Sequence, residues 1–409
     1  MNILLLSDSY PPEVRSSAIL MKELADGLVK LGHCVSVCTL LPKYNLVCKL
    51  DKNNQFLSSN IENGVRVIRL NSLPIHNTSM WVRGIGELTL PAIFSAGSLI
   101  AKKPDIIAIY SPPLPLGLAA AFMKILRGTP FLLNVQDLFP QNIIDVGKMR
   151  NPAIVGFFKG MERLIYSLAQ KITVHSESNR DFLLKERGVC SSKVEIIHNW
   201  VDTDLPLKYS LMDFRRKWGI KDKFILFFGG VMGHTQGLEM VLEVAESLKN
   251  VKDIIFLLVG DGSARANLEQ IVEQRNLSNV LFKPFISPQE YWSLLNEIDV
   301  GLLTLSAKVK TPVVPSKFLG YMAASKPYIA SLNKESDAIR MTQDSKAGIY
   351  VRAGDAMRFK DAILTLFNNK NLVKVMGRNG RKYVVNNFSK DICIAKYENI
   401  LKQCGNIIS

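Results

Sequence analysis

The chain has 409 residues, of which 47% are hydrophobic and 21% charged, a composition of folded globular proteins that excludes a disordered chain. This length predicts two domains of ordinary size. The formal net charge of +15 indicates an acidic partner, such as phosphorylated ligands, an anionic membrane surface or nucleic acid. The positive charge is spread over both halves and no recognised nucleic-acid module is present, so nucleic acid is disfavoured.

The cellular setting follows from the cysteines and from the apolar segments. The six cysteines show no paired spacing, which predicts free thiols in a reducing compartment. The N-terminus enters an apolar run without a basic segment, unlike a signal peptide. The most apolar window, residues 85–101, contains Glu87 and Pro91 and is short for a membrane span. We therefore expect a cytoplasmic protein that can rest on the inner face of the plasma membrane.

Apolar runs alternate with helical patterns from the first residues onward. The strands predicted in the first half are residues 2–6, 33–40, 64–70, 104–113, 130–137, 171–176 and 194–202. The helices predicted between them are residues 18–31, about 82–101, 116–126 and 177–187. This alternation is typical of a parallel, doubly wound α/β sheet.

The second half repeats this alternation. Its predicted strands are residues 224–228, 253–262, 279–285, 300–305, 327–331 and 347–351. Residues 203–222 are polar and broken, so we place the domain linker there. The prediction is an N-terminal Rossmann-like domain of residues 1–203 and a C-terminal one of residues 204–386. The last helix, about 387–409, is expected to cross back onto the first domain. Two such domains would face each other across a cleft, where the carboxyl ends of their strands hold ligands.

The loop around which the second half is organised follows the strand 224–228. It begins at Gly229 and Gly230, continues through Gly233, and leads into a helix at Leu238. A strand, a glycine-rich loop and a helix present free backbone N–H groups to an anion. An ordinary tight turn is the alternative for this pattern alone.

Three further loops after strands complete a predicted nucleotide-diphosphate site. Gly260 follows the strand 253–259, and Phe285 lies in a loop whose backbone suits the edge of a base. Ser316 and Lys317 open a helix, where a hydroxyl and an ammonium can meet a diphosphate. Each motif is weak alone, but all four follow strands of one predicted sheet.

The motifs together resemble the GT-B glycosyltransferases of the large retaining family 4. The resemblance is strongest to the bacterial branch of L-fucosamine transferases (WbuB-like). The segments that carry it are GHCVSVCT (32–39), YSPPLPLG (110–117), QDLFPQNIIDVG (136–147), IIHNWVD (196–202), GGVMGHTQGLE (229–239), VGDGSAR (259–265) and VPSKFLGYMAASKP (314–327).

The resemblance implies a metal-independent hexosyltransferase that retains anomeric configuration, with residues 1–203 as the acceptor domain and residues 204–386 as the nucleotide-sugar donor domain. Its donor would be a UDP-sugar carrying an N-acetylated deoxyhexose, such as N-acetyl-L-fucosamine, used as a co-substrate with no further cofactor. Its acceptor would be an undecaprenyl-diphosphate-linked glycan in the assembly of O-antigen or capsule. Asp137 is the candidate for orienting the acceptor or the sugar, and Glu13 lies in a loop where relatives touch the donor phosphates or the acceptor. A capping carboxylate and an exposed glutamate are the alternatives for these two residues.

The chain also departs from the family pattern. Relatives carry two glutamates eight residues apart around the last loop, and those positions hold Pro312 and Gly320 here. The usual arginine and lysine of the phosphate loop fall near Val231 and Gln236, which leaves Lys317 as the cation for the diphosphate. Two alternatives therefore stay open, a UDP-sugar epimerase of the same fold and a non-catalytic, membrane-associated partner protein.

Two signals of metal or membrane chemistry have simpler interpretations. Asp202-Thr203-Asp204 spells the DxD of metal-dependent transferases, but its place at a domain edge favours a turn. The five histidines lack metal-ligand spacing, so no metal is predicted. Residues 151–171 mix apolar and basic side chains at helical spacing, which suits either an anionic leaflet or the core of a Rossmann-like domain.

Overall fold

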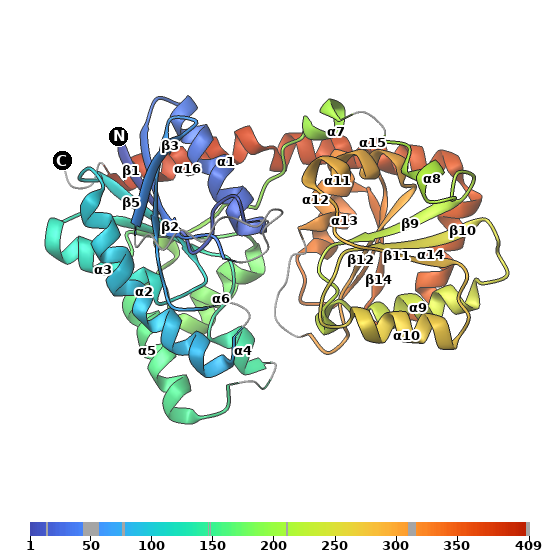
Figure 1. Ribbon diagram of the computed structural model, residues 1–409, viewed down its shortest axis with the longest axis horizontal. Coiled ribbons are helices and arrows are strands. Elements are labelled where there is room, and N and C mark those ends of the chain that lie inside the picture. Colours follow the sequence, from blue (N-terminus) through green and yellow to red (C-terminus); the bar gives the residue numbers. More distant parts are fainter. Residues whose placement is uncertain are drawn as a thin grey trace. The chain divides into compact units, whose positions relative to one another are not determined.

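The computed structural model describes residues 1–13, 15–43, 57–75, 78–145, 147, 149–209, 212–309 and 316–405. The chain divides into two compact units (Figure 1). Unit 1 comprises Met1–Asn199 and Asp391–Ser409, and unit 2 comprises Trp200–Lys390.

Unit 1 contains an eight-stranded sheet in the order β3-β4-β2-β1-β5-β6-β7-β8. Its strands are β1 (Asn2–Leu6), β2 (Cys34–Leu40), β3 (Leu57–Glu62), β4 (Val65–Leu70), β5 (Ile106–Ser111), β6 (Phe131–Val135), β7 (Lys171–Val174) and β8 (Val194–Ile196). All neighbours pair in parallel except β3, which is antiparallel to β4. The edge strand β3 was not predicted, because its sequence LSSNIE has little apolar character and is held by pairing with β4.

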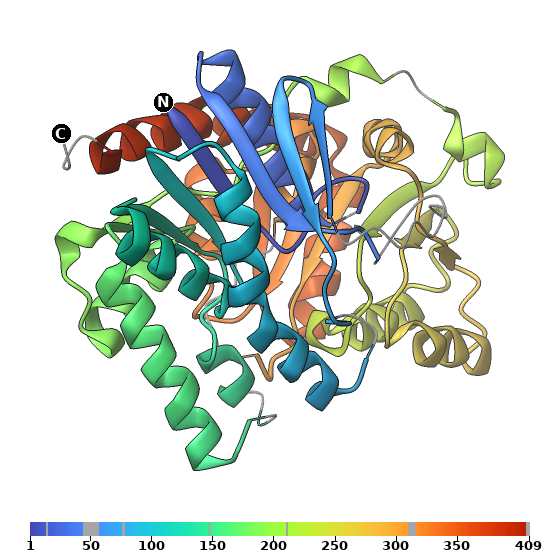
Figure 2. The ribbon, with the colours of Figure 1, turned by 60° about the vertical axis from the view of Figure 1, so that its left-hand side comes forward.

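Helices cover both faces of this sheet. They are α1 (Ser16–Lys30), α2 (Met80–Ile100), α3 (Leu116–Arg127), α4 (Gln141–Asp145), α5 (Pro152–Leu168), α6 (Glu177–Arg187) and α16 (Lys390–Gly405), with a 3₁₀ turn at Ser191–Lys193. The connections through α3, α5 and α6 step along the sheet in the direction opposite to the connection through α1. Since such crossovers are right-handed, α1 lies on the other face of the sheet. Helices α2, α3 and α5 pack side by side (Figures 1 and 2).

The C-terminal helix α16 packs on α1. A Cβ placed at Gly27 of α1 would come within 2.6 Å of Ile394 Cδ1, so the two helices are in close contact there. His33 Nε2 lies 2.9 Å from Glu398 Oε1. Residues from the two ends of the chain thus build one face of unit 1 (Figure 2).

Unit 2 contains a six-stranded, fully parallel sheet in the order β11-β10-β9-β12-β13-β14. Its strands are β9 (Phe224–Gly229), β10 (Ile254–Val259), β11 (Val280–Lys283), β12 (Val300–Thr304), β13 (Tyr328–Leu332) and β14 (Gly348–Arg352). Its helices are α7 (Leu205–Lys208), α8 (Phe214–Lys217), α9 (Leu238–Ser247), α10 (Arg265–Gln274), α11 (Pro288–Glu297), α12 (Lys317–Ala323), α13 (Ala338–Ser345), α14 (Ala356–Asn368) and α15 (Lys370–Phe388), with a 3₁₀ turn at His234–Gln236.

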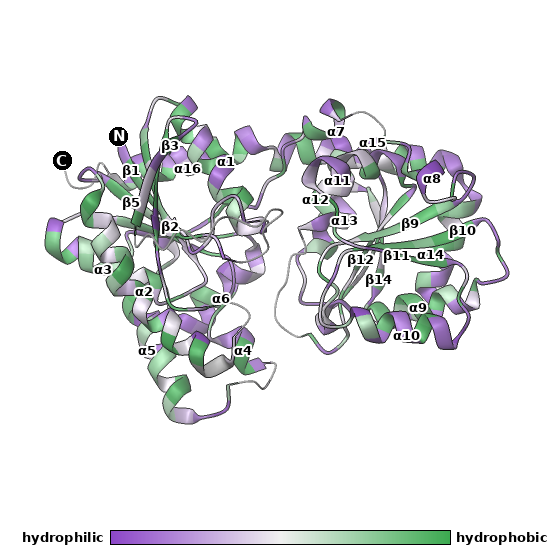
Figure 3. Cartoon of the chain, viewed as in Figure 1, coloured by the Kyte–Doolittle hydropathy of each residue, from purple (hydrophilic) through white to green (hydrophobic). Residues whose placement is uncertain are grey.

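The central strands of both units are buried on both faces, as expected for parallel sheets covered by helices, whereas the edge strand β3 is largely exposed (Figure 3). Strand β9 shows how one apolar run serves two cores. Ile225 and Phe227 point into the core cluster that contains α12, while Leu226 and Phe228 point into the cluster that contains α9. Continuous apolar runs therefore predict these strands correctly.

The segment 203–222, which we predicted to be a linker, packs within unit 2. Phe214 of α8 is 1% exposed and belongs to the core of that unit. Asn296 of α11 donates a hydrogen bond from Nδ2 to the Pro206 carbonyl at 2.8 Å. Short helices and scattered charges look like a linker in sequence, because the core that buries Phe214 and Ile220 is assembled from residues distant in the chain. Among the described residues, no helix is long and apolar enough to cross a membrane.

Candidate active site

Two glycine-containing loops of unit 2 lie against each other where β9 and β10 end. Gly230 N donates to Val259 O at 2.9 Å, and Met232 N donates to Asp261 O at 2.8 Å. Gly260 has a φ of 144°, and a Cβ there would lie 1.9 Å from Gly230 O. Only glycine tolerates this φ and this approach, so the two loops form one close-packed platform.

Lys317 stands over this platform. Its Cε is 2.9 Å from the point where a Cβ would sit on Gly230, and its Nζ lies 5.0 Å from the centroid of the Phe228 ring. The Nζ donates to Gln236 Oε1 at 3.1 Å. Burial lowers the pKa of the Lys317 ammonium from its ordinary value to about 8. The predicted phosphate loop and the predicted cation are therefore brought together by the fold of unit 2.

The surroundings of Lys317 suit an anion. An ammonium has three N–H donors, and in the part of the chain that the structure describes Gln236 is the single hydrogen-bond acceptor of Nζ. No described carboxylate lies within ion-pair distance of it. A partly buried, desolvated cation with neutral neighbours is costly unless a charge arrives to pair with it. A phosphate on the glycine platform would supply that charge.

The other predicted donor residues lie around this platform at the same ends of the strands. Gly229 is the last residue of β9, Gly233 begins the 3₁₀ turn, and Phe285 is 56% exposed after β11. Ser316 directly precedes α12 and is exposed, and its side chain makes no capping hydrogen bond. Pro312 and Pro315, in the same predicted loop, lie outside the described residues.

Gly320, at the position where the family resemblance implies a glutamate, is buried inside unit 2. A Cβ there would lie 3.5 Å from Leu295 Cδ1 and 3.6 Å from Tyr291 Oη, both on α11. Trp292 is the next neighbour, at 3.9 Å. A methyl group fits in ordinary contact, whereas a glutamate side chain would have to enter the space that these α11 side chains fill. Replacing Gly320 with glutamate is therefore a poor way to restore the family pattern.

In unit 1, charged side chains gather where β1 ends. Arg15 Nη1 lies 3.1 Å from Asp8 Oδ2 and 3.8 Å from Glu13 Oε2. Glu13 Oε1 accepts a hydrogen bond from the backbone N–H of Lys43 at 2.9 Å. Glu13 is 6% exposed, so it is not the exposed surface glutamate considered as an alternative.

Asp137 follows β6 at the same edge of the sheet. The residue is accessible to solvent, while desolvation by the surrounding protein raises the pKa of its carboxyl above the ordinary range. Burial raises the pKa of Tyr110, and the negative charges of Asp137 and Asp8 raise it further. Tyr110 therefore lies within electrostatic reach of both carboxylates and connects the ends of β1, β5 and β6.

Amide and imidazole side chains support this edge from β6 to β8. Asn199 Nδ2 donates to Gln136 Oε1 at 2.8 Å, and Gln136 Nε2 donates to Asn134 Oδ1 at 2.9 Å. His198 Nδ1 lies 2.8 Å from the His175 carbonyl. These bonds join successive strand-end loops, so His198 and Asn199 hold the edge in shape.

Sequence reasoning did not select Asp8, Arg15, Tyr110, Gln136 or His175 as site residues. Asp8, Gln136 and His175 each follow a buried apolar strand within two residues, and this position could have indicated them. Arg15 and Tyr110 do not occupy such a position, because Arg15 is the N-cap residue of α1 and Tyr110 lies inside β5.

The rejected DxD forms a turn. Asp202 accepts a hydrogen bond from the backbone N–H of Asp204 at 3.0 Å, and its carboxylate is paired with Lys390. Within the described ranges, no cluster of three or more histidine, cysteine, aspartate or glutamate side chains could hold a metal ion.

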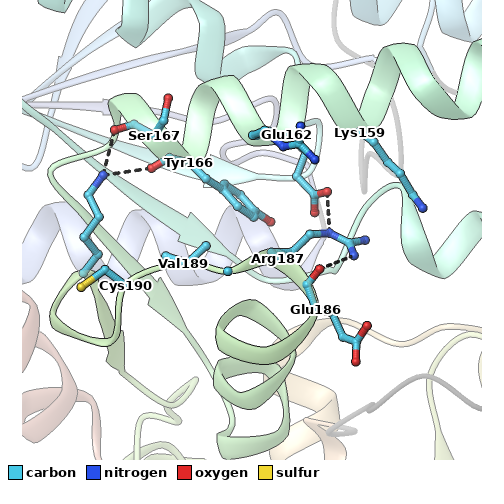
Figure 4. A pocket seen from close by; sticks show the side chains of 11 residues that line it. Lys159, Glu162, Tyr166, Ser167, Glu186, Arg187, Val189 and Cys190 are labelled. Carbon is cyan, nitrogen blue, oxygen red and sulfur yellow. Dashed lines mark hydrogen bonds and ion pairs between the residues drawn. The ribbon is translucent and has the colours of Figure 1, made fainter.

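A cavity of about 470 Å³ lies elsewhere, between α5 and the end of α6 in unit 1 (Figure 4). Its wall includes the ion pair of Arg187 Nε with Glu162 Oε2, at 2.7 Å. Burial raises the pKa of the Glu162 carboxyl, and the positive charge of the Arg187 guanidinium offsets part of that rise. None of the predicted site residues lines this cavity.

Comparison with known proteins gives the class. Residues 17–205 match the family described as Glycosyltransferase Family 4, and residues 212–383 match Glycosyl transferases group 1. Between them the two families cover most of the chain. The chain belongs to the GT-B glycosyltransferases of family 4/group 1, and the predicted fold of two Rossmann-like α/β domains is confirmed.

The chain is similar to a putative colanic acid biosynthesis glycosyl transferase, WcaI, of Escherichia coli K12. The two are 25% identical over 338 residues, which is 79% of this chain and 81% of the relative. Among solved structures, sucrose-phosphate synthase from Thermosynechococcus elongatus has a TM-score of 0.75 at 17% identity, with 98% of each chain covered. HepE from Anabaena, solved with UDP, has a TM-score of 0.71 at 14% identity, covering 98% of this chain and 100% of that one.

Proposed function

We propose that this glycosyltransferase is a metal-independent, retaining enzyme that transfers a sugar from a UDP-sugar to a lipid-linked glycan. The sugar would be an N-acetylated deoxyhexose such as N-acetyl-L-fucosamine, as the resemblance to the WbuB-like branch implies. The acceptor would be an undecaprenyl-diphosphate-linked glycan of bacterial surface polysaccharide. The enzyme would act at the inner, anionic face of the plasma membrane.

The observation that carries the proposal is the placing of Lys317 over the joined loops of Gly230 and Gly260. A partly buried ammonium that, among the described residues, donates to Gln236 as its one acceptor lies beside a backbone platform that admits no side chain at Gly260, and this arrangement suits an anion. The exposed ring of Phe285 and the backbone after β11 offer a neighbouring surface for a base. A nucleoside diphosphate would use both the anion-binding platform and the neighbouring surface for a base.

Two comparisons support the donor and the pathway. HepE, which shares the fold, was solved with UDP, and that favours a uridine nucleotide here. WcaI is named for colanic acid biosynthesis, and an O-antigen chain mannosyltransferase of Escherichia coli is also similar, at 24% identity over 181 residues. Assembly of a bacterial polysaccharide is therefore the proposed setting.

In the proposed reaction, the acceptor hydroxyl attacks the anomeric carbon from the side that the nucleotide leaves. The new bond joins the acceptor oxygen to the anomeric carbon, and the broken bond joins that carbon to the β-phosphate oxygen. The acceptor proton passes to the leaving phosphate, and UDP departs. Negative charge grows on the phosphate in the transition state, so Lys317 and the backbone N–H groups of the platform lower the barrier.

The function is tested with the purified chain, a panel of UDP- and GDP-sugars, and a lipid-linked glycan acceptor. We expect UDP to raise the unfolding temperature, since it binds the folded state, and one UDP-sugar to release UDP when the acceptor is present. Proton NMR of the product should show retained anomeric configuration. An epimerised UDP-sugar without acceptor would instead indicate the epimerase, and donor binding without turnover would indicate the non-catalytic protein.

Replacing Asp137 with asparagine tests the acceptor side. We expect kcat/KM for transfer to fall roughly 10²-fold, the scale of a lost positioning contact, with UDP binding unchanged. In the wild type, kcat/KM should rise with pH through a pKa above the ordinary aspartate range, because desolvation raises the pKa of Asp137. That rise should vanish in the variant. An unchanged pH profile would show that Asp137 acts as a structural residue.

A further inference from the structure

Large apolar side chains are exposed on one helical layer of unit 1. They lie on α2, α3 and α5, which pack side by side, and include Ile85, Phe122, Ile125, Leu126, Phe157 and Leu164. Ile125 is 78% exposed. Among the described residues of α1 and α16, which build the other face, Ile19 is the single exposed large apolar side chain. Single exposed apolar residues are ordinary, but a group confined to three adjacent helices marks an interaction surface.

The charges on this layer are mostly positive. The three helices carry five cations, Arg83, Lys124, Arg127, Lys159 and Arg163, and two acids. Both acids are ion-paired, Glu87 with Arg83 and the buried Glu162 with Arg187, each at 2.7 Å. On α1, acids and bases instead balance, as with Lys22 and Asp26. The layer therefore has an excess of positive charge among its exposed apolar side chains.

Lys159 and Arg163 are exposed and also line the cavity between α5 and α6 (Figure 4 labels Lys159). In the part of the chain that the structure describes, neither has a carboxylate within ion-pair distance. The cavity of about 470 Å³ is large enough for a polar group of small-ligand size. Two exposed cations in the lining of a recess, with the exposed Phe157 and Leu164 on the same helix, can receive a phosphate while the apolar side chains enter a lipid layer.

A second copy of the chain is a poor occupant of this surface. In a two-fold dimer the same patch meets itself, so the cations of one copy would face those of the other. The centres of protein interfaces are also depleted in lysine. An anionic leaflet instead pairs with the cations and takes up the apolar side chains, as amphipathic helices do at membrane surfaces.

We propose that the outer face of α2, α3 and α5 in unit 1 is the docking surface of this enzyme for an anionic lipid leaflet, with lipid phosphates at Lys159 and Arg163. This proposal rests on the proposed function, because a lipid-linked acceptor would reach the enzyme at this face.

The test is co-sedimentation of the full chain with vesicles of phosphatidylglycerol and phosphatidylcholine, and with vesicles of phosphatidylcholine alone. We expect binding to the anionic vesicles and little to the neutral ones. Lys159→Glu with Arg163→Glu should weaken binding roughly tenfold or more, since each basic residue near the surface contributes substantially. Ile125→Ser with Leu126→Ser should weaken it by a similar factor through lost apolar burial. The matched control on α1, Ile19→Ser with Lys30→Glu, should bind like the wild type.

Thermal stabilisation by UDP is measured on every variant and should not change, because the substitutions lie in unit 1. Equal vesicle binding by all variants, or no binding by the wild type while UDP still stabilises it, would overturn the docking surface and leave the proposed function standing. A concentration-dependent dimer in light scattering that the α5 substitutions disrupt would also overturn it. Loss of the UDP effect in the wild type would count against the proposed function itself.

Discussion

Replacing Lys317 with methionine is expected to abolish most of the stabilisation that UDP gives the wild-type protein. Removing one partner of a buried, hydrogen-bonded charge pair weakens binding by about 2–5 kcal/mol, which is at least about thirtyfold in Kd. Isothermal titration with UDP measures this directly. Methionine fills the same space beside Phe228 and Gly230 without a charge, so the free protein should fold with unchanged or higher stability.

The matched control is Lys249→Met, an exposed lysine just beyond the end of α9. It removes the same charge from unit 2 and should leave the Kd for UDP within about twofold, because exposed charges contribute little at physiological salt. If Lys317→Met binds UDP as tightly as the control does, the diphosphate lies elsewhere.

The pH dependence provides a second signature of Lys317. Its pKa is about 8 in the free protein, and a bound diphosphate would raise it. Below pH 8 the ammonium is already charged, and UDP affinity should not depend on this group. Above pH 8 binding requires proton uptake, so the affinity should fall by up to about tenfold per pH unit. The Lys317→Met variant should lose this dependence between pH 8 and 10.

The lowered pKa of Lys317 also makes the stability of the free protein depend on pH. Stability changes in the direction opposite to the affinity for UDP. The pKa of Lys317 is lower in the folded state than in the unfolded state, so the unfolded state binds more protons above pH 8. The contribution of this group to the free energy of unfolding therefore rises as pH increases from about 8 toward the ordinary lysine pKa. Comparing wild type and Lys317→Met by denaturation over this range separates it from other titrating groups.

Replacing Gly260 with alanine should be the most destabilising conservative change in unit 2. A methyl group there would lie 1.9 Å from Gly230 O, at a φ of 144° that L-residues rarely adopt. Overpacking and backbone strain together should cost roughly 2–6 kcal/mol. For a unit of this size the unfolding temperature should fall by roughly 6–18 °C, measurable by calorimetry. Because the loops would separate, UDP binding should be lost as well.

Gly233→Ala in the neighbouring loop is the matched control. The nearest atom to a Cβ at Gly233 is Thr235 Oγ1, at 3.9 Å, and its φ of −102° suits any residue. We expect a change in stability within about 0.5 kcal/mol, as for ordinary surface positions. Equal destabilisation by the two substitutions would contradict the close-packed platform.

The strands and the fold class were predictable because parallel strands buried on both faces are continuous apolar runs. Residues 2–6, 131–135 and 224–229 show this, and each is followed at once by the polar or glycine residue that builds a site. Strand β3 and the helices within 203–222 were missed, because β3 depends on its partner strand and Phe214 on a core assembled from other segments.

The residue types and their order along the chain thus establish a doubly wound α/β protein with glycine loops, and point to a phosphate ligand. Folding decides which of those residues meet. Lys317 and Gly230 are far apart in sequence, and their contact exists because β9 and β12 are neighbours in the sheet. The burial that sets the pKa of Lys317 and the hydrogen bond from the Lys43 backbone N–H to Glu13 likewise arise from long-range packing, which no local pattern records.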